Sequence, residues 1–248
     1  MRSLCCFVLH LCLAANVCFA GSLSKGDVIR LDRGNGAVSG TAGGEFSIWK
    51  QVGANWEFIG KTFCVEISEF VSLGSLYKVG GVSDRAVFGG GVSGDILDQT
   101  TKFLYNSYSN GTLASYGTGF TYGNVNSIDA LQYAIWAIEG ERALTGTGND
   151  ILAQTLINLA TAQVATNPTG DFGVFVLNLF DISTPDALLS AFDPLNVSTW
   201  SAVSAYKKQD QLYYVPEPAS VTIFALGFTL AGAYRVRSRF RTAKKQVA

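Results

Sequence analysis

The C-terminal stretch most constrains what this chain can fold into, because it joins an extended proline segment, an uncharged apolar run and a basic tail. Val215-Pro-Glu-Pro-Ala-Ser220 leads into the 16 uncharged residues from Ala219 to Tyr234, and the basic tail begins at Arg235. At about 1.5 Å per helical residue, this run falls slightly short of the ~30 Å hydrocarbon core of a bilayer. Basic residues stay on the cytoplasmic side, so the residues before Pro216 are expected outside the membrane. The pattern predicts a marginal membrane anchor on an exported chain.

These three parts resemble the PEP-CTERM sorting signal, which we place at residues 215–241 with a transmembrane segment at 219–234. The resemblance rests on six positions in the motif and the basic tail: Pro216, Glu217, Pro218, Arg235, Arg237 and Arg239. It implies that an exosortase-type membrane peptidase cuts near Pro-Glu-Pro and transfers or releases the protein. It also implies passage through the inner membrane of a Gram-negative cell to the cell surface or the extracellular matrix. The alternative is an ordinary single-pass anchor in which Pro-Glu-Pro occurs by chance.

The N-terminal residues have the three-part form of a secretory signal peptide. Arg2 is followed by an apolar stretch from Leu4 to Ala15, and Cys18-Phe-Ala20 supplies small residues before Gly21. We therefore expect residues 1–20 to be removed after Ala20. Lipoprotein cleavage at Cys12 or Cys18 is the weaker alternative, because neither cysteine is preceded by the small residues that such a site usually carries.

Removal of residues 1–20 leaves one cysteine, Cys64, and no histidine. The exported chain then has no second thiol for an intramolecular disulfide. The absence of histidine excludes a Cys-His protease, a Ser-His-Asp hydrolase and a His-ligated zinc or haem site. Residues 21–215 carry 11 basic and 18 acidic side chains, and 11 − 18 gives a formal charge of −7. This charge argues against nucleic acid as a partner, and no cofactor or metal set is expected.

Apolar periodicity changes twice along the exported residues, from strand-like to helical and back. Strand patterns occur in five places: Val28–Leu31, Glu45–Trp49, Trp56–Ile67, Phe172–Phe180 and Gln211–Tyr214. Helical patterns occur in three: Asp95–Tyr108, Ser127–Glu139 with Asn126 as its cap, and Asn149–Ala165. This order predicts an α+β fold, in which an antiparallel sheet or sandwich carries an inserted three-helix lobe and a C-terminal transmembrane sorting helix follows. We expect the domain at residues 21–200 and a linker at 201–214.

Cys64 stands in the strand-like segment Thr62-Phe-Cys-Val-Glu66. Side chains alternate between the two faces of a strand, so Cys64 and Glu66 share a face and Phe63 points the other way. The face of Cys64 is the more polar one, which argues mildly against a small core filler. The local pattern leaves both a packing role and a chemical role open.

Gln132 stands in the helical segment Ala130-Leu-Gln-Tyr-Ala-Ile-Trp136. Apolar residues at helical spacing form the buried stripe, while Gln132 and Trp136, four residues apart, lie together on its flank. An uncharged amide beside a tryptophan can be a structural hydrogen-bonding group or a reactive one.

Together, Phe63-Cys-Val-Glu66 and Leu131-Gln-Tyr-Ala-Ile-Trp136 resemble the two signature segments of bacterial surface thioester domains of the TQXA type. The resemblance implies that the Cys64 sulfur joins the side-chain carbonyl of Gln132 with loss of ammonia. Position 131 is Leu where the family often has Thr, so a hydroxyl from that position is missing. The better-known members come from Gram-positive cell walls, so attachment to a host does not follow.

The chemistry is acyl transfer, and it needs the thiol and the amide held together with donors near the developing oxyanion. Phe63, Tyr133 and Trp136 are the candidates to keep water from the thioester. Glu66 can orient the site or help proton transfer, or it can be a solvated surface carboxylate. An amine or hydroxyl on a partner would take the acyl group once, without turnover, so we do not expect an enzyme.

Two alternatives belong to other functional classes. The first is a noncatalytic matrix or structural protein in which Cys64 and Gln132 only pack. The second is a hydrolase that uses two carboxylates across a cleft, as a glycosidase does, and the sequence offers no such pair.

Overall fold

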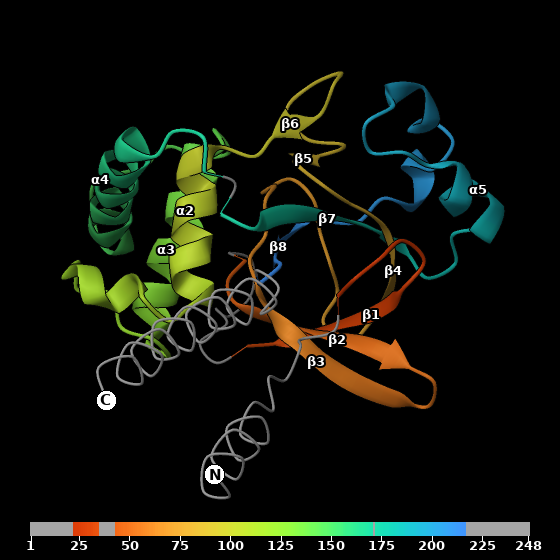
Figure 1. The fold of residues 1–248 in the computed structure, drawn as a ribbon, viewed down its shortest axis with the longest axis horizontal. Helices are drawn as coiled ribbons and strands as arrows, with labels where there is room; N and C mark the ends of the chain where they lie inside the picture. Colours follow the sequence, from red (N-terminus) through yellow and green to blue (C-terminus); the bar gives the residue numbers. More distant parts are fainter. Residues whose placement is uncertain (1–21, 35–42, 171, 217–248) are drawn as a thin grey trace, which may run out of the picture. The chain divides into compact units, whose positions relative to one another are not determined.

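Short strands precede and follow a block of helices in the computed structural model, which describes residues 22–34, 43–170 and 172–216 (Figure 1). The strands are β1 (Val28–Arg33), β2 (Phe46–Val52), β3 (Asn55–Thr62), β4 (Leu76–Ser83), β5 (Arg85–Ala86), β6 (Asp95–Ile96), β7 (Val174–Asp181) and β8 (Gln211–Tyr214). The α-helices are α2 (Gln99–Ser109), α3 (Val125–Ile138), α4 (Asn149–Thr166) and α5 (Asp186–Ala191). Three short 3-10 turns are η1 (Leu113–Tyr116), η2 (Val197–Thr199) and η3 (Ser204–Tyr206).

Six of the strands form one antiparallel sheet in the order β3-β2-β1-β4-β7-β8, and β5 pairs with β6 as a separate hairpin. β7 follows the helices in sequence yet pairs between β4 and β8, so the helical residues are an insertion between strands. The register of β4 against β7 shifts between Val79 and Gly81. Gly80 lies at this irregularity, where a Cβ would overlap the ring of the buried Phe180.

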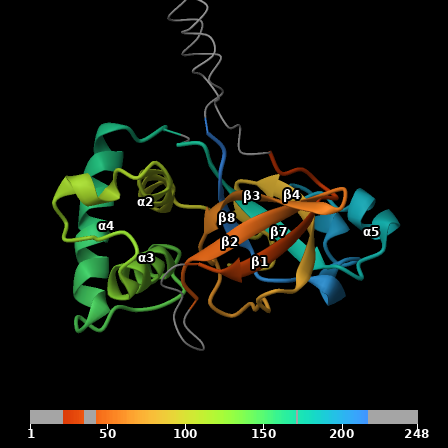
Figure 2. The same ribbon diagram turned by 90° about the horizontal axis from the view of Figure 1, so that it is seen from below.

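The helical lobe, defined as α2, α3 and α4, lies at one end of the sheet, and α5 lies at the other end (Figures 1 and 2). Its buried apolar residues belong to the same core cluster as residues of the sheet. Leu131 and Ile135 of α3 are in this cluster, together with Phe63 after β3 and Val176 of β7. The lobe therefore shares its core with the sheet, within one compact unit, Ala20–Val215.

Asparagine and aspartate side chains fix where two of these helices begin. Asp98 accepts a hydrogen bond from Thr100 N at 2.6 Å, and Asn124 accepts one from Ser127 N at 3.0 Å. Such caps satisfy backbone donors that have no partner within the helix. The prediction of Asn126 as the cap of the second helix was therefore wrong by two residues.

Two predicted boundaries differ more. The helix expected from Asp95 begins only at Gln99, because Asp95 and Ile96 pair with β5 and Ile96 is 59% exposed. The strand expected to reach Ile67 ends at Thr62, so Cys64 makes only a single bridge to Gln211 of β8.

The α+β class, the antiparallel sheet and the inserted helical lobe were predicted correctly. The sequence left a sheet and a sandwich open, and six of the described strands form a single sheet. The helix expected at Asn149–Ala165 is present as α4. Residues 201–214, expected as a linker, include η3 and β8. The signal peptide and the sorting helix at 219–234 lie outside the described residues. Within those residues, no helix combines the length and apolarity that a bilayer span requires.

We expect Gly80→Ala to destabilise the fold by about 1–3 kcal/mol, because the added methyl group must displace a buried aromatic ring. Gly60→Ala is the matched control, since Gly60 is also in a strand and a Cβ there meets no atom within 4 Å. Urea unfolding of residues 21–215 measures both. Equal stability of the two variants would contradict the expected clash.

Candidate functional site

The side-chain amide of Gln132 is bound to the backbone of Cys64 at two points. Gln132 Oε1 accepts a hydrogen bond from Cys64 N at 3.0 Å, and Gln132 Nε2 donates to Cys64 O at 2.9 Å. The same oxygen accepts a second bond from Gly44 N at 3.2 Å. Both Cys64 and Gln132 are 0% exposed. The structure therefore brings the two predicted thioester partners together in a buried site.

Three separate segments build this contact. Gln132 stands in the middle of α3, whose stripe of Ile128, Leu131 and Ile135 is buried in the main core. The Cys64 backbone reaches Gln132 because the chain after β3 turns inward and pairs with Gln211. The backbone of the third segment, at Gly43 and Gly44, approaches from the start of β2.

Glycine is required at the third segment. Gly43 has φ +65°, and a Cβ there would lie 2.8 Å from a ring carbon of Trp136 and 3.1 Å from Gln132 Oε1. Only a residue without a side chain fits this conformation and this space. The close approach lets the next amide, Gly44 N, reach the carbonyl oxygen.

The sulfur of Cys64 lies between two further side-chain amides. Cys64 Sγ donates to Gln209 Oε1 at 2.9 Å, and Gln211 Nε2 donates to the sulfur at 3.6 Å. Burial raises the pKa of the Cys64 thiol to about 12, and the bond from Gln211 acts in the opposite direction. The thiol is therefore protonated at neutral pH.

Sequence reasoning missed Gln209, Gln211, Gly43 and Gly44. The polar run Gln209-Asp-Gln211 directly before an apolar strand is a visible signal, because polar residues on a buried strand need partners. Nothing in the sequence shows, however, that this run meets Cys64.

The aromatic residues predicted as a shield divide between two places. Trp136 packs with Cys64 and Phe46 in a small cluster, and Tyr133 lies against it. Arg142 sits 3.9 Å above the Tyr133 ring and pairs with Asp150. Phe63 belongs instead to the main core, where it meets Tyr108 edge to face. Of the three predicted shielding residues, Trp136 therefore packs in the cluster of Cys64 and Tyr133 lies against that cluster.

Glu66 is buried, at 1% exposed, so the alternative of a solvated surface carboxylate was wrong. Its Oε1 has no hydrogen-bond partner. Burial raises the pKa of Glu66 to about 9, and the neighbouring Glu141 and Glu69 carboxylates act in the same direction. Glu66, two residues after Cys64, is therefore protonated at neutral pH.

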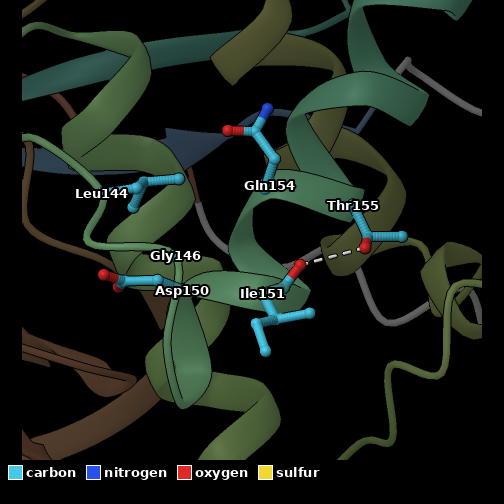
Figure 3. Close-up of a pocket in the computed structure, with 6 residues that line it drawn as sticks. All are labelled: Leu144, Gly146, Asp150, Ile151, Gln154 and Thr155. Atoms are coloured by element: carbon cyan, nitrogen blue, oxygen red, sulfur yellow. Dashed lines mark hydrogen bonds between the residues drawn. The ribbon is translucent and has the colours of Figure 1, made fainter.

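The hollow drawn in Figure 3 is separate from this site, because it is lined by other residues. It lies at the start of α4 and is lined by Leu144, Gly146, Asp150, Ile151, Gln154 and Thr155. Its polar groups have internal partners: Asp150 binds Arg142 and Thr145, and the Thr155 hydroxyl donates to Ile151 O at 3.0 Å. These bonds stabilise the helix start.

The contacts of the Gln132 carbonyl oxygen supply one feature that acyl transfer needs. Two backbone N–H groups point at one carbonyl oxygen, as they do in an oxyanion hole. They polarise the carbonyl of Gln132 toward attack, and burial keeps water away. Among the described residues, no group of three or more His, Cys, Asp or Glu side chains is placed to hold a metal ion.

We expect the free energy of unfolding to fall as the pH rises from about 5 to 9. Between the ordinary glutamate pKa of 4.5 and the raised folded value of about 9, native Glu66 keeps a proton that the unfolded chain has lost. The raised pKa values of Glu139, about 7, and of Asp95 act in the same direction.

Urea unfolding at pH 5, 7 and 9 measures this slope. Glu66→Gln should flatten it by up to roughly 1 kcal/mol per pH unit. Glu57→Gln, at an exposed strand position, should leave it unchanged. A slope in Glu66→Gln that equals that of the native chain would show that Glu66 is ionised in the folded protein.

No protein-family model, curated protein or solved structure matches this chain.

Proposed function

We propose that this chain is an exported bacterial surface protein in which Cys64 and Gln132 form an internal thioester for covalent attachment to a partner. The observation that carries this proposal is the pair of backbone N–H groups on Gln132 Oε1, one of them from Cys64 itself. Two donors on one carbonyl oxygen are the arrangement that stabilises the oxyanion of acyl transfer.

The reaction balances without a cofactor. The bond from Cys64 Sγ to the side-chain carbonyl carbon of Gln132 forms, the bond from that carbon to Nε2 breaks, and the thiol proton leaves with the nitrogen as ammonia. An amine or hydroxyl of a partner then attacks the thioester. The acyl group of Gln132 passes to the partner, and Cys64 regains its proton.

The enclosure of the site supports a single reaction without turnover. Cys64, Gln132 and Trp136 are all buried, so water has little access to a thioester once it has formed. After transfer, Gln132 remains bonded to the partner, and no step regenerates the amide. The protein would act as a covalent adhesin or matrix anchor.

Sorting by an exosortase-type peptidase is part of the proposal. Pro216 is the last residue that the structure describes. The rest of the motif, Glu217 and Pro218, and the basic residues beyond it lie outside the described residues. Pro216 is exposed and directly follows the last backbone bond of the sheet, from Val215 N to Gly173 O at 2.8 Å. An exposed, proline-held backbone is what a peptidase needs at its cleavage site.

A noncatalytic structural protein is the second candidate, and two observations favour it. Gln132 makes three well-formed hydrogen bonds, and the Cys64 thiol is protonated, with a pKa of about 12. A structural glutamine that ties a helix to a sheet would show the same bonds.

Intact mass of residues 21–215 separates the two candidates. We expect the native chain to be lighter than its sequence by one ammonia, and methylamine to replace the deficit with an adduct at Gln132. Cys64→Ala and Gln132→Ala should both show the plain mass. Gln154→Ala, at an exposed position on α4, is the control that keeps the deficit.

A native mass equal to the sequence would overturn the thioester. Alkylation of Cys64 after unfolding would then confirm that its thiol is free. The noncatalytic structural role would be the remaining candidate.

Sorting is tested on the full chain in a cell that contains an exosortase. Replacement of Pro216, Glu217 and Pro218 by alanine should retain the uncut protein in the membrane fraction, whereas Glu57→Ala should be processed normally. Processing of the triple variant would contradict recognition of this motif.

A further inference from the structure

A second pair of side-chain amides surrounds the reactive sulfur. Gln209 Oε1 lies 2.9 Å from Cys64 Sγ, and Gln211 Nε2 lies 3.6 Å from it. Both side chains are buried. They approach the sulfur in complementary ways, because Gln209 offers an acceptor for the thiol hydrogen and Gln211 offers a donor to the sulfur itself.

Further contacts hold both side chains. Gln209 Nε2 donates to Glu66 O at 2.6 Å, and Gln211 Nε2 also donates to Gln209 O at 3.4 Å. The Gln211 backbone also forms the bridge to Cys64. The two side chains are therefore fixed in orientation, with the acceptor and the donor turned toward the sulfur.

Asp210, between them, anchors the strand from its other face. Asp210 Oδ2 accepts from Val87 N at 2.9 Å and from Asn178 Nδ2 at 3.0 Å, and Oδ1 accepts from Leu179 N at 3.2 Å. Since side chains alternate along an extended chain, this anchor places Gln209 and Gln211 on the side of Cys64.

Packing alone does not explain this arrangement. Burying a polar side chain costs free energy that hydrogen bonds only offset, so apolar residues would fill the same space at lower cost. Two buried amides directed at one sulfur would instead orient its hydrogen and stabilise its negative charge during a reaction.

We propose that Gln209 and Gln211 are catalytic residues of thioester formation and transfer. This inference rests on the proposed function. Gln209 holds the S–H bond and thereby orients the sulfur, but it does not keep the proton, which leaves with Gln132 Nε2 as ammonia. Gln211 donates to the negative charge that is left on the sulfur when the thiol gives up its proton, before the carbon–sulfur bond has formed. The same bond stabilises the thiolate when a partner's amine displaces it from the thioester.

The test uses residues 21–215, the compact unit that contains all the described strands, helices and core clusters. Gln209→Met and Gln211→Met keep the length of each side chain and remove its amide. Chain that is expressed in insoluble, unfolded form keeps the Cys64 thiol and the Gln132 amide unreacted, and dilution of the denaturant starts folding and the reaction. A separate folded sample with its thioester already formed is treated with methylamine to measure displacement. Ammonia loss is then followed by mass against time, while tryptophan fluorescence follows folding.

We expect Gln211→Met to slow ammonia loss at least about tenfold after folding is complete, which is the scale of one hydrogen bond to a charged group. It should also slow displacement by methylamine at a preformed thioester. Gln209→Met should slow formation more than displacement, because the thioester sulfur has no hydrogen to orient. Gln51→Met, at an exposed position on β2, should match the native rates.

The outcomes separate the two proposals. Native rates in folded Gln209→Met and Gln211→Met, with a thioester present, would overturn this inference and leave the proposed function intact. Absence of a thioester in the native chain would overturn both. If a methionine variant fails to fold, Gln209→Asn and Gln211→Asn keep a buried amide but withdraw it from the sulfur, and the same rates then decide.

Discussion

The two-point contact between the Gln132 amide and the Cys64 backbone is the interaction on which the rest of the site depends. It joins α3 of the helical lobe to the chain that leaves β3, and through Gly44 it reaches the start of β2. A buried amide that lost these partners would carry the full cost of desolvation. The lobe therefore docks on the sheet in one arrangement, which also sets the carbonyl of Gln132 against its two donors.

Local patterns predicted most elements, and tertiary contacts decided where they end. The α4 helix and the β8 strand could be identified from local residue patterns, although β8 forms its pairs with the distant β7. The alternation that begins in β3 continues to Ile67, yet the strand ends at Thr62, where the chain turns toward the lobe. The cap of α3 is Asn124 although Asn126 has the same chemistry, and only the backbone conformation distinguishes them.

Site residues could be predicted from the sequence where they belong to a short local motif. They could not be predicted where their role depends on a contact between residues far apart in the sequence. Cys64 and Gln132 were singled out by the residues around them. Gln211 is 147 residues from Cys64 in sequence, so its contact with the sulfur follows only from the position of β8 beside β7. Likewise, alternation placed Glu66 on a polar face, but packing against Gly89 buries it.

Burial gives this site opposing requirements. Under the proposed function, a thioester between Cys64 and Gln132 persists only while water is excluded, yet a partner's nucleophile must reach the same carbonyl. Local opening meets both needs if it is rare, because regions open with free energies below that of global unfolding. Because the pKa of Glu66 is raised to about 9, local opening of the segment just after Cys64 costs less free energy as the pH rises.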